Sequence, residues 1–63
     1  MFYDSNNVEL QIGDVVEYDD IEHDILKTTG TVRKNLIGIW EVVNMDLQSG
    51  NDLVNITNIT KWQ

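Results

Sequence analysis

The sequence predicts an all-β fold, a small five-stranded barrel, and three observations lead to it. Seven Val, seven Ile and five Thr supply stiff, branched side chains that suit strands, whereas Ala and Pro are absent. Residues 30–43 form the longest β-prone stretch, with a polar break at Lys34-Asn35 that is typical of a hairpin. Short apolar runs alternate with turn residues along the rest of the chain. Sixty-three residues without a linker predict one domain, 1–63, with residues 1–7 as an N-terminal arm.

The segment from Val8 to Tyr18 predicts the first strand. Leu10, Ile12, Val16 and Tyr18 share one parity, and Glu9, Gln11 and Glu17 share the other. This alternation is typical of a strand with one buried face. Gly13-Asp14 interrupts the pattern and indicates a bulge or a turn.

Residues 19–29 allow two interpretations. Ile21 and Ile25 stand four residues apart, as on one face of a short helix capped by Asp19 or Asp20. The same residues also fit a long first loop whose isoleucines close one end of the barrel. The sequence leaves this choice open.

The C-terminal third predicts a turn-rich connection over 44–51, a fourth strand over 52–56, a tight 3-10 turn at Thr57-Asn58 and a closing strand over 59–62. Together with the hairpin, these elements predict a core that combines aliphatic and aromatic residues. Its expected members are Leu10, Ile12, Val16, Tyr18, Val32, Trp40, Val42, Val54, Ile56 and Ile59.

This order of signals resembles the SH3-like small β-barrels of the Tudor and KOW type, over roughly residues 9–62. Leu10-Gln11-Ile12-Gly13-Asp14-Val15-Val16-Glu17-Tyr18 resembles their first strand with its Gly-Asp entry, and Trp40-Glu41-Val42-Val43 their third. The resemblance implies a fold more than a function. The size, the acidity and the abundance of Asn and Ile are also similar in style to accessory proteins of bacteriophages.

The net charge of the chain indicates which kinds of binding partner to expect. Eleven acids against four bases give a net charge of −7. Such a chain repels phosphate and anionic lipid, so we expect neither direct nucleic-acid binding nor membrane binding, and a basic partner surface instead. No secretory signal is apparent, which makes the cytoplasm the expected compartment.

The acids are concentrated in one part of the chain, around a single histidine, His23. We expect the partner-binding residues to be Asp14, Glu17, Asp19, Asp20, Glu22 and Asp24, with Trp62 as an aromatic anchor. Two other interpretations of the cluster remain, a solvated acidic loop and a metal site. The spacing matches no EF-hand, and one His is too few for a His-based zinc site, so we predict no metal and no cofactor.

Catalysis finds no support in the sequence. There is no Cys, and Ser5 and Ser49 lie in polar turns remote from His23 along the chain. We therefore expect a noncatalytic interaction module whose acidic face binds a basic partner, with inhibition of a nucleic-acid-binding protein by nucleic-acid mimicry as its sharper form. The alternatives are a KOW-like component of a nucleic-acid-associated assembly and a structural homo-oligomer that uses Ile37, Ile39 and Val43.

Overall fold

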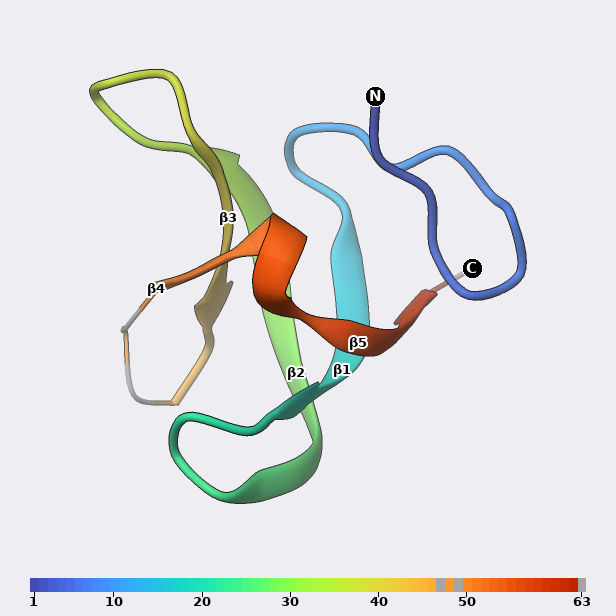
Figure 1. Cartoon of the computed structure of the whole chain (residues 1–63), viewed down its shortest axis with the longest axis vertical. Coiled ribbons are helices and arrows are strands. Elements are labelled where there is room, and N and C mark those ends of the chain that lie inside the picture. The colour runs from blue at the N-terminus through green and yellow to red at the C-terminus, as the bar shows by residue number, and fades with distance from the viewer. Residues whose placement is uncertain (47, 49, 63) are drawn as a thin grey trace.

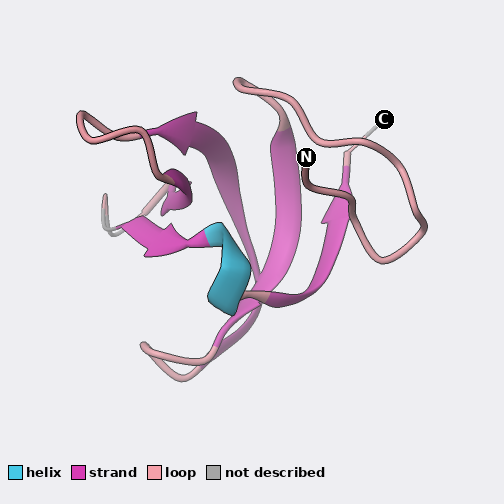
Figure 2. Ribbon diagram, turned by 45° about the horizontal axis from the view of Figure 1, so that its top comes forward, coloured by secondary structure: helices cyan, strands magenta, loops and turns pink. Residues whose placement is uncertain are grey.

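The structure, a computed structural model, describes residues 1–46, 48 and 50–62. Over these residues the chain is all-β, as predicted, and five antiparallel strands form one curled sheet in the order β4-β3-β2-β1-β5 (Figure 1). A short 3-10 turn before the last strand, also predicted, is the helical element of the described residues (Figure 2). The elements are β1 (Val15–Asp20), β2 (Ile25–Lys34), β3 (Trp40–Asn44), β4 (Gly50–Asp52), η1 (Leu53–Asn55) and β5 (Thr57–Lys61).

The central hairpin forms where the sequence predicts it. β2 and β3 pair in the register Val32↔Val42 and Lys34↔Trp40, and a turn over 35–39 joins them. Val32 and Val42 are fully buried, which shows the face of the hairpin that packs on the core. Gly30 is required here, because its backbone passes under the ring of Tyr18 and against Val42.

Most of the predicted core is confirmed. Val16 and Tyr18 on β1 are fully buried, and Trp40 and Ile56 are partly buried against the core. Leu53 joins the core although it was not predicted. The buried apolar residues are Leu10, Val16, Tyr18, Val32, Val42, Leu53 and Ile59.

The prediction for Ile12 is wrong, since its side chain is 52% exposed. The first strand does not begin at Val8 but at Val15. A tight turn precedes it, in which the Asp14 amide donates to the Gln11 carbonyl and the Gln11 amide donates to the Asp14 carboxylate. Gly13 has a φ of 97°, so this turn breaks the alternation and directs Ile12 outward.

Neither interpretation of residues 19–29 is correct. β1 and β2 continue through this segment as a long hairpin, closed by a turn over 21–24. Ile21 is exposed in the turn, so it does not close the end of the sheet. The β-branched residues here follow the strand preference of their type, and cross-strand pairing outweighs the helix-like spacing.

The fourth strand is shorter than predicted and the 3-10 turn comes earlier. β4 ends at Asp52, and the Ile56 amide donates to the Leu53 carbonyl within η1. The turn buries Leu53 and leaves Val54 72% exposed, so the core assignment of Val54 is wrong. Leu47 and Ser49, within the predicted connection, lie outside the described residues.

The N-terminal arm is held by a buried carboxylate. Asp4 accepts hydrogen bonds from the amides of Asn6 and Val8 at 2.8 Å and from the amide of Lys61 at 3.0 Å. These bonds lower the pKa of Asp4, with the Lys61 amide as the largest cause. The arm also places the centroid of the Phe2 ring 5.4 Å from that of the Trp40 ring.

Within residues 1–46, 48 and 50–62, no helix has the length and apolar character to cross a membrane.

Candidate functional site

The hairpin of β1 and β2 separates the predicted acidic cluster into three groups. Strand alternation turns Asp20 inward together with Val16 and Tyr18, and it turns Glu17 and Asp19 toward the other face. Glu22 and Asp24 are exposed in the closing turn. The acids therefore do not share one face, although several of them gather at one end of the hairpin.

Asp20 is part of the interior, so its assignment as a partner contact is wrong. Its carboxylate accepts from the His23 amide at 3.1 Å and the Asn51 side-chain amide at 2.8 Å, and it lies 2.9 Å from His23 Nδ1. Burial acts to raise the pKa of Asp20, but the hydrogen bonds from Asn51 and His23 bring it below its ordinary value. Asp20 thus ties the β1–β2 turn to β4.

Asp19 organises two bulges. The pairing of β1 shifts register beside Asp19 on both sides, toward β2 and toward β5. One carboxylate oxygen accepts from the Lys27 amide at 3.1 Å, and the other from the Asn58 side-chain amide at 2.8 Å. Lys27 and Asn58 both have a φ of 55°, as irregular backbone at a bulge permits. The hydrogen bond from Asn58 is the largest cause of the lowered pKa of Asp19.

Asp14 and Glu17 lie away from the turn, since Asp14 precedes β1 and Glu17 stands near its start. Asp14 accepts from the Gln11 amide and forms an ion pair with Lys61, whose Nζ is 3.2 Å away. Glu17 is half-buried beside Thr60, its partner on β5. Both residues retain some exposure, but neither is next to the exposed acids of the turn.

A small cleft forms where the β1–β2 turn meets β4 and η1, with a volume of about 70 Å³. Its lining includes the acidic residues Asp19, Glu22 and Asp52 and the apolar residues Ile21 and Ile56. Asn51 and Asn55 complete the lining. We call Asp19, Glu22, Asp24 and Asp52, together with this cleft, the acidic end.

The acidic end carries unbalanced charge. Among the described residues the recorded ion pairs are those of Lys61 with Asp14 and of His23 with Asp20, and neither involves a carboxylate of the acidic end. Asp52 was missed from the sequence, because only the pairing of β4 with β3 and the contact of Asn51 with Asp20 bring it to the turn. No pattern local to residues 50–55 indicates that proximity.

Trp62 is 57% exposed, but it does not join the acidic end. Its amide donates to the carbonyl of Val15, at the start of β1, whereas the acidic end lies at the close of that strand. The structure therefore places the predicted aromatic anchor and the exposed acids at opposite ends of β1.

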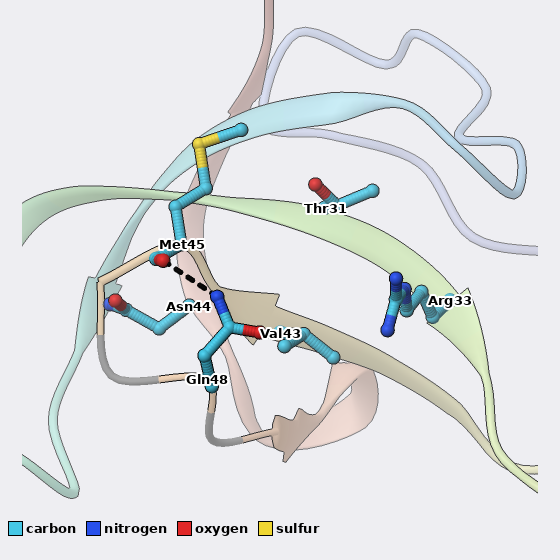
Figure 3. Close-up of a pocket in the computed structure, with 6 residues that line it drawn as sticks. All are labelled: Thr31, Arg33, Val43, Asn44, Met45 and Gln48. Atoms are coloured by element: carbon cyan, nitrogen blue, oxygen red, sulfur yellow. Dashed lines mark hydrogen bonds between the residues drawn. The ribbon is translucent and has the colours of Figure 1, made fainter.

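A second depression, of about 110 Å³, lies on the outer face of β2 and β3 (Figure 3). Thr31 and Val43 form its floor, and Arg33 and Met45 lie at its two ends. Gln48 donates from its side chain to the Met45 carbonyl at 2.8 Å, which forms one wall. Its volume is below that of ordinary ligand pockets, which start near about 300 Å³.

The described residues contain no group of three or more His, Asp or Glu side chains arranged to hold a metal ion. Comparisons with protein-family models, with curated proteins and with solved structures found no match to this chain. The geometry of the acidic end is therefore the basis for assigning a function.

Proposed function

We propose that this protein is a noncatalytic cytoplasmic interaction module whose acidic end receives Lys or Arg side chains from a basic partner surface. The observation that supports this most strongly is the cleft between the β1–β2 turn and β4. Three acidic residues of its lining, Asp19, Glu22 and Asp52, have no recorded ion-pair partner among the described residues.

The lining of the cleft suits a long cationic side chain in two ways. Ile21 and Ile56 offer apolar surface for the methylene stem of Lys or Arg, while the carboxylates lie near its charged head. The volume of about 70 Å³ admits the end of one side chain and no larger ligand. The net charge of −7 adds long-range attraction, which speeds the encounter with a basic partner.

Titration with a defined probe tests the proposal. A short Arg- and Lys-rich peptide should shift the amide NMR signals of residues 19–24 and 51–56, and an uncharged peptide of equal length should not. The double variant Glu22→Gln with Asp52→Asn should bind about twofold to thirtyfold more weakly, since each of the two exposed pairs contributes about 0.2 to 1 kcal/mol. Binding should also weaken as salt rises.

A matched control separates the site from the net charge. Asp46 is exposed on the β3–β4 connection and does not line the cleft, so Asp46→Asn with Glu9→Gln makes the same charge change elsewhere. This control should keep most of the affinity. Equal losses in both double variants would show that only the overall charge attracts the peptide, and the cleft would then have no specific role.

The class of partner is a finer proposal. We propose a nucleic-acid-binding protein that is inhibited by mimicry of phosphates, because its basic groove complements the acidic end. Capture of the partner from nuclease-treated lysate at low salt, followed by its release with DNA or RNA, tests mimicry. Capture that nucleic acid does not reverse favours a KOW-like assembly component instead.

We also propose a relationship to the SH3-like barrels, supported by the five antiparallel strands with a 3-10 turn before the last.

A further inference from the structure

The turn between β2 and β3 displays apolar side chains to solvent. Leu36 is fully exposed and Ile37 is 79% exposed, and Ile39 is also exposed. We call Leu36, Ile37 and Ile39 the hairpin tip. In Figure 1 it projects from the molecule at the opposite end from the β1–β2 turn. Large aliphatic side chains gathered at a projecting turn indicate a contact surface.

Hydrogen bonds within the turn brace the tip. Asn35 accepts through its side-chain oxygen from the amides of Ile37 and Ile39, at 3.1 and 3.0 Å. The Asn35 amide donates to the Ile39 carbonyl at 2.9 Å, and the Gly38 amide donates to the Asn35 carbonyl at 3.0 Å. A turn with these bonds already formed loses little conformational freedom when it docks, which favours binding.

The tip is flanked by positive charge. Arg33 and Lys34 are exposed at the end of β2, and neither takes part in a recorded ion pair of the described residues. Residues 33–40 contain no acid, and the acid that follows them, Glu41, lies opposite Arg33 in the β2–β3 pairing. The tip thus needs a partner that is apolar at its centre and anionic around it.

The acidic end has that chemistry. Its cleft is lined by Ile21 and Ile56 together with the acidic residues Asp19, Glu22 and Asp52. Within one chain the two ends cannot meet, because they lie at opposite ends of a molecule whose longest extent is 27 Å (Figure 1). Between two chains they can.

We propose that the hairpin tip of one copy docks against the acidic end of a second copy, head to tail, with the end of one tip side chain in the cleft. This inference uses the acidic end proposed above and names a second copy of this chain as one of its partners. Salt at physiological strength screens charge beyond about 8 Å, so the local attraction of Arg33 and Lys34 outweighs the net repulsion of two acidic molecules. Because the contact joins unlike surfaces, it extends into an open chain or closes into a ring.

Sedimentation velocity on wild-type protein and two variants tests the proposal. The tip variant carries Leu36→Ser and Ile37→Ser, and the end variant carries Glu22→Lys and Asp52→Lys. All four positions are exposed, so both variants should fold, which circular dichroism checks. Wild-type protein should show a mean mass that rises with concentration at physiological salt. Each variant alone should remain monomeric, while Met45→Ser, an exposed apolar control, should behave as wild type.

Mixing the two variants is the decisive step. The tip variant retains its acidic end and the end variant retains its hairpin tip, so an equimolar mixture should form dimers and stop there. A monomeric wild-type protein at millimolar concentration would overturn the proposal. So would an association that the tip variant abolishes but the mixture does not restore, because that result indicates tip-to-tip contact.

The basic-peptide titration keeps this proposal separate from the proposed function. The tip variant should bind the peptide as wild type does. If the tip variant binds the peptide while wild-type protein is monomeric, the result supports the interaction module and excludes self-association. If wild-type protein associates and the mixture restores dimers, but no peptide binds, the result supports self-association and excludes the interaction module.

Discussion

Single residues in this chain hold backbone conformations that their types disfavour. Among the residues that the structure describes, five that are not glycine have positive φ, namely Asn7, Asp24, Lys27, Gln48 and Asn58. Asn and Asp tolerate this region because their short side chains bond locally, whereas Lys has no such compensation. Lys27 adopts it because its amide donates to the Asp19 carboxylate at the bulge. Strain at Lys27 is therefore imposed by the sheet around it.

Replacing Lys27 with glycine should stabilise the fold. Glycine adopts a φ of 55° without a Cβ clash, and we expect a gain of up to about 1 kcal/mol after the added freedom of the unfolded chain is subtracted. Urea denaturation followed by tryptophan fluorescence measures the change. Lys27→Gln makes the same charge change but keeps the Cβ, so it should show no such gain. A lower denaturation midpoint for Lys27→Gly than for Lys27→Gln would contradict the argument.

Gly30 should not tolerate alanine. A Cβ at this position would lie 2.6 Å from Val42 Cγ1 and 2.9 Å from Tyr18 Cε1. Such overpacking costs about 1 to 3 kcal/mol, so Gly30→Ala should lower the free energy of unfolding by that amount. Gly50→Ala serves as the comparison, because its close neighbour is the flexible carboxylate of Glu41, which can move. A smaller loss at Gly30 than at Gly50 would count against the packing shown here.

Elements differ in how far their own sequence determines them. The β2–β3 hairpin was predicted because β-branched residues and a polar break at Lys34-Asn35 lie within one stretch. The β1–β2 hairpin was not, because Ile21 and Ile25 have helix-like spacing and only pairing with neighbouring strands decides between the alternatives. The prediction for residues 53–56 was wrong for a different reason, which is that their sequence has no alternation between polar and apolar residues. Leu53, Val54 and Ile56 are all apolar, so the sequence could not show that a 3-10 turn buries the first and exposes the second.

The candidate site was predictable only in part. Glu22 and Asp24 lie in a turn, and their exposure follows from the local concentration of acids. The burial of Asp20 depends on strand parity and on Asn51, and the arrival of Asp52 depends on the position of β4 in the sheet. Contacts between segments about thirty residues apart leave no trace in spacing.

The N-terminal arm should detach as a unit when its carboxylate is removed. Asp4→Ala removes the acceptor for three backbone amides, so hydrogen exchange should accelerate at Asn6, Val8 and Lys61. The β2–β3 amides should retain their protection, because none of them bonds to Asp4. Glu9→Ala, an exposed acid on the same segment, is the control and should change little. Uniform acceleration across the sheet would show that the arm is part of one cooperative core.

The whole molecule combines carboxylates that stabilise it by accepting hydrogen bonds with other, exposed carboxylates that repel one another. The pKa values of Asp4, Asp19 and Asp20 all lie below the ordinary value of 3.8, since each ionised group accepts hydrogen bonds in the fold. The unfolded chain therefore binds protons more readily than the folded chain in acid. Their stabilisation is complete above pH 3.8 and is lost as the pH falls through the lowered values.

The free energy of unfolding should consequently rise with added salt near neutral pH and fall when the solution is made acidic. Near pH 7, added salt should stabilise the fold by screening the net charge of −7. Below pH 3.8, unfolding should set in as the internal carboxylates accept protons. Thermal unfolding over a grid of pH and salt measures both effects. In the Asp4→Asn variant, the melting temperature should fall less steeply as the pH drops below 3.8 than it does in the wild type. An unchanged pH dependence would show that Asp4 does not contribute to acid unfolding.

The arm also determines how this sheet meets other polypeptides. Ser5 donates its amide to the Ile59 carbonyl, and the Asp4 carboxylate accepts from the Lys61 amide, so the arm occupies hydrogen-bonding groups on the outer side of β5. At the other margin, β4 offers only three residues. Open strand edges recruit foreign strands and start fibrils. The arm thus protects the edge of β5 from pairing with other chains. If the arm dissociated, this edge would become a template for amyloid-like growth.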